Sequence, residues 1–92
     1  MSYVMVTADF PDVTTTQRDA IYKCLKEKNW VKVTEPGRDI DTVWYASFKE
    51  NVTEKSAIAI GTEDFVSCSQ KYCRCKLVLH WGPSKPTFHG LT

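Results

Sequence analysis

The sequence predicts an α+β fold in which a four-stranded antiparallel sheet carries two helices on one face. Its 92 residues, 42% hydrophobic and 25% charged, have the length and composition of one globular domain spanning residues 1–92. Strand-like segments with a period of two and helix-like segments with a period of 3.6 follow one another in the order strand, helix, strand, strand, helix, strand. In such a chain right-handed crossovers place both helices on the same face of the sheet.

Residues 3–10 are the first expected strand. Its two alternating rows are Val4, Val6 and Ala8 on one side and Tyr3, Met5 and Thr7 on the other. Neither row carries a charge before Asp9, which favours a strand deep in the sheet. Because the row that does not meet the helices is also uncharged, we expect a homodimer or another partner to cover that face.

The first helix is expected to begin after Thr14. Thr14 and Gln17 have the spacing of a capping box, in which each side chain satisfies a free backbone N–H group of the other residue. The apolar stripe that follows consists of Ile21, Cys24 and Leu25, with the stem of Lys28 extending it. Asn29 is suited to end the helix.

Residues 30–34 and 40–48 are expected to form an antiparallel hairpin. The five residues between them, Glu35 to Asp39, include the Pro-Gly pair typical of turns. The second strand alternates strictly. Ile40, Thr42, Trp44, Ala46 and Phe48 share one face of it.

A second helix is expected from Thr53 to Ile60, with Gly61 ending or kinking it and Thr62 restarting it as far as Ser69. Residues 76–81 give the last strand. The resulting order is that of the ferredoxin-like βαββαβ fold. Residues 82–92 are interpreted as a C-terminal arm that folds back over the open sheet face, or as a binding edge. In either case Trp81, Lys85 and Phe88 are the candidate partner-binding residues.

The formal net charge of +1 gives no overall basic field of the kind expected in a protein that binds nucleic acid mainly by neutralising phosphates. No apolar run approaches the roughly 20 residues of a membrane span. The first residues resemble no secretory signal, so a cytoplasmic location is expected.

Two carboxylates follow the first strand. Asp9 stands at its C-terminal end and Asp12 follows in the turn, so both lie at a rim where a ligand can be met. A carboxylate there, paired with its counterpart across a dimer axis, can hold a Mg²⁺ ion that polarises a phosphate. The alternative is that both only stabilise the turn or the helix N-terminus.

The first half of the chain resembles the small CRISPR-associated adaptation proteins that partner the CRISPR integrase. The resemblance lies in Val6-Thr7-Ala8-Asp9-Phe10-Pro11-Asp12, in an Arg18-bearing helix ending Leu25-Lys26-Glu27-Lys28-Asn29-Trp30, and more loosely in Asp41-Thr42-Val43-Trp44. A small antitoxin that cleaves its toxin's messenger RNA has the same fold. The resemblance implies a ferredoxin-like homodimer and, in some relatives, a metal-dependent endoribonuclease with Asp9 as the metal ligand. Arg18, Lys32 and Arg38 would then contact phosphates.

Cys68, Cys73, Cys75 and His80 are ligand types of a zinc site. Their spacing is not that of a zinc knuckle, and five residues of strand would separate Cys75 and His80 by about 16–17 Å on opposite faces. The spacing thus favours reduced cysteines over zinc, with Cys24 in the core.

Two functions stay open. One is a nuclease-like or nucleic-acid-associated protein, and the other is a non-catalytic module that binds a protein through its sheet face or its arm.

Overall fold

The computed structural model describes residues 1–35 and 38–86, with the backbone alone for residues 34–35 and 38–42. The elements are β1 (Ser2–Asp9), α1 (Thr15–Glu27), β2 (Val31–Glu35), β3 (Arg38–Phe48), α2 (Glu54–Ser69) and β4 (Lys76–Gly82). This βαββαβ order and a single antiparallel sheet confirm the predicted ferredoxin-like α+β fold.

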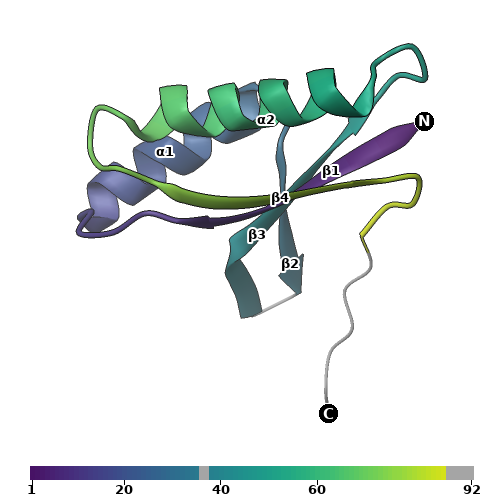
Figure 1. The fold of residues 1–92 in the computed structure, drawn as a ribbon. Coiled ribbons are helices and arrows are strands. Elements are labelled where there is room, and N and C mark those ends of the chain that lie inside the picture. The colour runs from purple at the N-terminus through teal and green to yellow at the C-terminus, as the bar shows by residue number, and fades with distance from the viewer. Residues whose placement is uncertain (36–37, 87–92) are drawn as a thin grey trace.

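The sheet has the strand order β2-β3-β1-β4, so the first strand of the chain is central. Both helices lie on the same side of the sheet, and the segment after β4 turns toward the opposite side (Figure 1). None of the helices in the described ranges is long and apolar enough to cross a membrane.

The two rows of β1 have different surroundings. Val4 and Val6 are fully buried beneath the helices and Ala8 is nearly so, whereas Tyr3 and Met5 on the other side are half-buried and Thr7 is exposed. The two uncharged rows of β1 therefore have different roles. One row builds the core, and the other lines a face that no helix covers.

Helix α1 begins with the predicted capping box. The Thr14 hydroxyl accepts a hydrogen bond from the Gln17 backbone N–H at 3.1 Å, and the Gln17 side chain accepts one from the Thr14 N–H at 3.0 Å. Asn29 follows the helix with a φ of 71°, in the left-handed region that asparagine tolerates well. Ile21 and Leu25 of the predicted stripe are fully buried.

Helix α2 is continuous from Glu54 to Ser69, so the prediction that Gly61 ends one helix and Thr62 starts another is wrong. Gly61 is buried, and a Cβ atom there would lie 3.1 Å from Leu79 Cδ2 and 3.2 Å from Trp30 Cη2. The glycine therefore serves close packing, since its missing side chain lets the helix approach both residues. The predicted cap is present, with the Thr53 hydroxyl accepting from the Ser56 N–H at 3.1 Å.

The β2–β3 hairpin is tighter than predicted. Glu35 pairs with Arg38 in the ladder, so the strands extend into the five-residue turn predicted for residues 35–39. The predicted Pro-Gly pair at 36–37 lies outside the described residues. The strand ladder thus continues through residues that the turn pattern had assigned to the loop.

Aromatic side chains fill the core between the helices and the sheet. Trp44 is fully buried and lies edge-on to Tyr22 of α1 and Phe65 of α2, with ring centroids 5.2 and 6.2 Å away. Trp30 contacts Phe65 at 5.0 Å and donates a 2.9 Å hydrogen bond from Nε1 to Asp64 Oδ2. Trp44 and Trp30 thereby link α1, α2 and the sheet in one aromatic core.

Candidate functional site

The side of the sheet away from the helices is here called the open face. Its described residues are Val31 of β2, Val43, Tyr45 and Ser47 of β3, Tyr3, Met5, Thr7 and Asp9 of β1, and Lys76, Val78 and His80 of β4. Side chains alternate along each strand, so residues paired across the strands point to the same side. The register of the strands therefore determines which residues belong to the open face.

The register arranges the open face in cross-strand rows. Tyr45 pairs with Met5, which pairs in turn with His80, while Val31 flanks Tyr45 from the edge strand. Most of these side chains keep some exposure to solvent, and Val31 and Val78 are exposed by 46% and 69%. The face therefore presents aromatic and aliphatic groups to solvent, with polar groups at its margins.

The segment after β4 returns across this face. Lys85 Nζ lies 5.5 Å from the centroid of the Tyr45 ring, a cation–π contact. A hollow of about 210 Å³ lies beside it, lined by Tyr3, Met5 and His80 of the sheet and by Pro83, Ser84 and Pro86 of the returning segment. Residues 83–86 thus add a basic group to an aromatic face. Phe88 lies outside the described residues.

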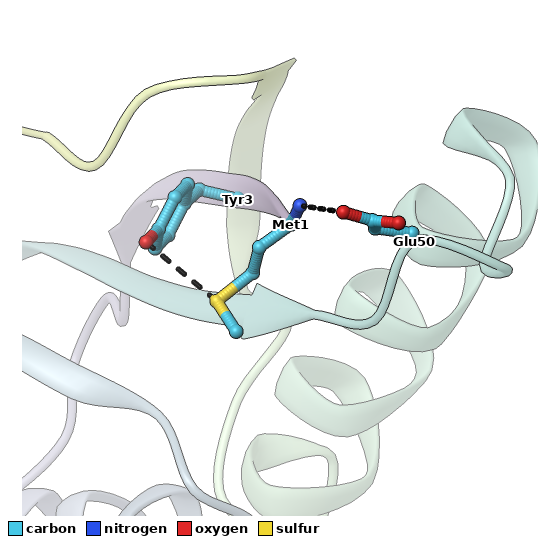
Figure 2. Close-up of polar contacts among 3 residues, drawn as sticks. All are labelled: Met1, Tyr3 and Glu50. Atoms are coloured by element: carbon cyan, nitrogen blue, oxygen red, sulfur yellow. Dashed lines mark hydrogen bonds and ion pairs between the residues drawn. The ribbon is translucent and has the colours of Figure 1, made fainter.

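Tyr3 lies at one end of the open face, and Figure 2 shows its contact with Met1. Its hydroxyl contacts Met1 Sδ at 3.7 Å, and the Met1 amino group forms a 3.4 Å ion pair with Glu50 Oε1. Both partners of the ion pair are mostly exposed, so it contributes little to stability. Tyr3 is half-buried, so part of it stays accessible on the open face.

Asp9 lies at the other end of the same row of β1, exposed and paired in the ladder with Lys76. Asp12 is exposed in the following turn, with a φ of 59°. Both carboxylates lie near Cys73. Burial is the main cause that raises the pKa of the Cys73 thiol, and the negative charges of Cys75, Asp9 and Asp12 raise it further. The end of β1 therefore brings two carboxylates close to a half-buried thiol, with Lys76 beside Asp9 in the ladder.

No group of three or more His, Cys, Asp or Glu side chains within the described ranges is placed to hold one metal ion. A Mg²⁺ ion at Asp9 would therefore need ligands from water, a substrate phosphate or a second copy of the chain. The magnesium site stays a prediction.

Of the predicted phosphate-binding residues, Lys32 lies on the side of the sheet opposite Asp9. Arg18 is exposed on α1. Lys32 pairs with Trp44 and therefore points to the helix side, where its Nζ lies 4.7 Å from the Tyr22 ring centroid. Arg38 begins β3, and its side chain lies outside the described part. Among the described residues, the basic groups at the open face are Lys76 and His80 of β4, together with Lys85 beside the Tyr45 ring.

Lys32 belongs to a separate groove between α1 and β2. The groove measures about 610 Å³ and is lined by Asp19, Tyr22, Lys23, Lys26, Glu27 and Lys32. Its acidic and basic groups are mixed, so its charge selects no class of ligand.

Trp81 points to the helix side of β4, where it is half-buried and packs against the core. Its indole Nε1 is buried and has no hydrogen-bond partner among the described residues. The structure therefore places Trp81 on one side of the sheet and Lys85 on the other.

The cysteines divide into two pairs. Cys24 and Cys68 form a disulfide between α1 and α2, with 5.7 Å between their Cα atoms. The expectation that both are reduced is wrong, because the stripe of α1 that carries Cys24 packs against the end of α2. The disulfide also removes Cys68 from any zinc site, and His80 points to the open face. Cys73 and Cys75 are free and half-buried.

Sequence reasoning did not select Tyr3 and Tyr45 as site residues. The signal was present in the alternation, since both stand in rows opposite the core-forming rows of their strands. What was missing was the knowledge of which row the helices cover.

Comparison of the chain with protein-family models, curated proteins and solved structures found no match. The resemblance to the CRISPR-associated adaptation proteins and the related antitoxin therefore stays a prediction, supported by its own residues alone.

Proposed function

We propose that the protein binds single-stranded RNA on the open face and cleaves it in a metal-dependent reaction at Asp9. The observation that carries the proposal is the alternation of β1. It places Asp9 in the same row as Tyr3 and Met5 and beside the strand that carries Tyr45. A recognition surface and a candidate catalytic carboxylate therefore share one face.

Tyr3 and Tyr45 lie on the two central strands, where an extended strand of RNA crossing the sheet would meet both. Four-stranded sheets of RNA-binding domains stack bases on aromatic side chains in this way. Stacking tolerates any base, because every base has a π face. Lys76, His80 and Lys85 are the groups available to phosphates, and this small number agrees with a net charge of +1.

Asp9 supplies an exposed carboxylate at the end of this path. One carboxylate and a substrate phosphate, with water completing the coordination shell, are ligands that Mg²⁺ accepts. Such an ion would polarise the phosphate for attack. Asp12, in the adjoining turn, would bind the water shell of the ion.

Binding is tested by fluorescence anisotropy with a labelled 12-nucleotide single-stranded RNA at low salt. We expect Tyr45→Ala to weaken binding about tenfold, because stacking on one aromatic contributes about 1–3 kcal/mol per base. Lys85→Gln should weaken it less. Lys71→Gln is the matched control, since Lys71 makes a similar cation–π contact with Tyr72 away from the open face. Equal effects of the two lysine substitutions would refute the placement of RNA on the open face.

Cleavage is tested on the same RNA with Mg²⁺ and with EDTA. Asp9→Asn should abolish cleavage while leaving anisotropy nearly unchanged, and Glu63→Gln on the exposed side of α2 should leave both unchanged. Cleavage by the Asp9→Asn variant at the wild-type rate would refute the role of Asp9. Binding without any cleavage would reduce the function to RNA binding.

A second candidate function, binding a protein partner or a second copy of the chain, is favoured by the exposed Val31 and Val78 at the edges of the open face. Aliphatic side chains there add contact area for a protein surface, but they cannot form ion pairs or hydrogen bonds with phosphate groups. Sedimentation of the wild type and of Val78→Lys separates the two. A dimer that Val78→Lys dissociates, together with no anisotropy change on mixing with RNA, would favour this function over the first.

A further inference from the structure

The turn between β3 and α2 carries a motif that the proposed function does not use. Asn51-Val52-Thr53 has an asparagine two residues before a threonine, with no proline between them, which is the acceptor pattern for N-linked glycosylation. The other asparagine of the chain, Asn29, lacks the pattern. Three matching residues become a modification site in a surface loop of a protein that folds in an oxidising compartment. The structure bears on both conditions.

The turn itself meets the first condition. The Val52 N–H donates a 3.0 Å hydrogen bond to the Lys49 carbonyl, which closes a turn with Asn51 as its third residue. Val52 is half-buried against the core, whereas Asn51 is exposed. Thr53 is exposed as well, and its hydroxyl caps α2 by accepting from the Ser56 N–H. The turn is thus held at both ends while its asparagine faces solvent.

The disulfide between Cys24 and Cys68 bears on the second condition. Disulfides form and persist in oxidising compartments such as the lumen of the endoplasmic reticulum and the extracellular space. Cys73 and Cys75 are free but half-buried. Burial is the main cause that raises the pKa of the Cys73 thiol, and a thiol that stays protonated is slow to oxidise because the thiolate is the reactive form. A free pair beside a disulfide therefore agrees with such a compartment.

We propose that Asn51 is the acceptor of an N-linked glycan. The donor is an oligosaccharide carried on a lipid pyrophosphate. The side-chain amide nitrogen of Asn51 attacks the anomeric carbon of this oligosaccharide and gives up one proton. A carbon–nitrogen bond forms, the bond from that carbon to the pyrophosphate oxygen breaks, and the lipid pyrophosphate leaves, so nothing is oxidised or reduced.

The position of the turn determines which surface the glycan covers. Glu50, next to Asn51, forms its ion pair with the amino group of Met1, so the turn lies beside the start of β1 (Figure 2). From Ser2 to Asp9 the strand runs for about 23 Å, at about 3.3 Å per residue. A glycan at Asn51 therefore leaves the Asp9 end of the sheet open. The inference does not rest on the proposed function, and neither excludes the other.

The first test uses protein purified from the organism that makes it. Trypsin cuts after Lys49 and Lys55 and releases residues 50–55, which contain the whole motif. Digestion with peptide N-glycosidase F in heavy-oxygen water should convert Asn51 to an isotope-labelled aspartate, which mass spectrometry detects. Asn29 is the internal control and should stay unlabelled. Protein in which Asn51 is unmodified throughout would overturn the proposal.

The second test separates the motif from the fold. The full chain is expressed in cultured animal cells behind a cleavable signal peptide, and we expect a secreted species that peptide N-glycosidase F reduces to the mass of the polypeptide. Asn51→Gln and Thr53→Asp should abolish this shift, whereas Thr53→Ser should keep it. Aspartate caps a helix as well as threonine does, so the loss in Thr53→Asp would come from the motif and not from unfolding. Secreted wild type without a glycan, or a shift that survives Asn51→Gln, would refute the assignment.

Discussion

The two faces of the sheet are built from the same strands but differ in how deeply their side chains are buried. On the covered face Val4, Val6 and Trp44 are fully buried beneath two helices. On the open face Val78 is 69% exposed, and Tyr3, Met5 and Tyr45 keep partial access to solvent. The difference teaches that stability comes from one side of the sheet, which leaves the residues of the other side free to serve recognition.

The largest effect is expected from Trp44→Ala on the covered face. The substitution removes a fully buried indole that contacts both helices, and we expect it to lower the free energy of unfolding by about 3–5 kcal/mol. Urea denaturation followed by far-UV circular dichroism measures the loss. A loss below about 1 kcal/mol would mean that the covered face is not the stabilising one.

Removal of the disulfide between the helices should rank next. Cys24 and Cys68 are 44 residues apart, and closing a loop of that length stabilises by about 2–4 kcal/mol through the entropy of the unfolded chain. The Cys24→Ser/Cys68→Ser variant should therefore unfold at lower urea than the wild type. The matched Cys73→Ser/Cys75→Ser variant should not.

A thiol count gives an independent check on this pair. Unfolding the wild type without reductant should expose two thiols per chain to Ellman's reagent. A count of four would contradict the disulfide.

Gly61→Ala probes how closely α2 approaches the covered face. Alanine favours a helix by about 1 kcal/mol over glycine, but here its Cβ would come within 3.2 Å of the buried Trp30 ring. We expect crowding to dominate and to cost about 1–2 kcal/mol net. Ala59→Gly, at an exposed position of the same helix, should cost about 1 kcal/mol by propensity alone. Stabilisation by Gly61→Ala would show that Gly61 is not packed against Trp30.

The smallest effect is expected from Val78→Ala on the open face. An exposed side chain leaves little buried area to lose, so the free energy of unfolding should change by no more than about 0.5 kcal/mol. Thermal unfolding at several protein concentrations measures it. A loss above about 1 kcal/mol that grows with concentration would show that a second copy covers the open face.

Local sequence patterns were sufficient for the order of the elements. The capping box at Thr14 and Gln17 and the strict alternation around Trp44 act between near neighbours, so they can be recognised without the fold. Patterns could not show that Gly61 packs against Trp30 or that Cys24 meets Cys68, because both depend on how the helices lie on the sheet. For the same reason the sequence placed Asp9 at the end of a strand but could not show which face of the sheet it lies on.

The disulfide also bears on the expected cytoplasmic location. Disulfides persist in oxidising compartments and are rare where thioredoxin and glutathione keep thiols reduced. The Cys24–Cys68 bridge therefore argues against that expectation, which rested on the N-terminal residues and on the lack of an apolar run as long as a membrane span.

The central position of β1 has a consequence for the order in which the molecule assembles. β2 and β3 are neighbours in the chain, so their hairpin closes a short loop and can form early. β1 pairs with β3 and with β4, and the pair of Tyr3 with Gly82 joins residues from near opposite ends of the sequence. During synthesis β1 must therefore wait for β4, and until β4 has been made one edge of β1 stays unpaired.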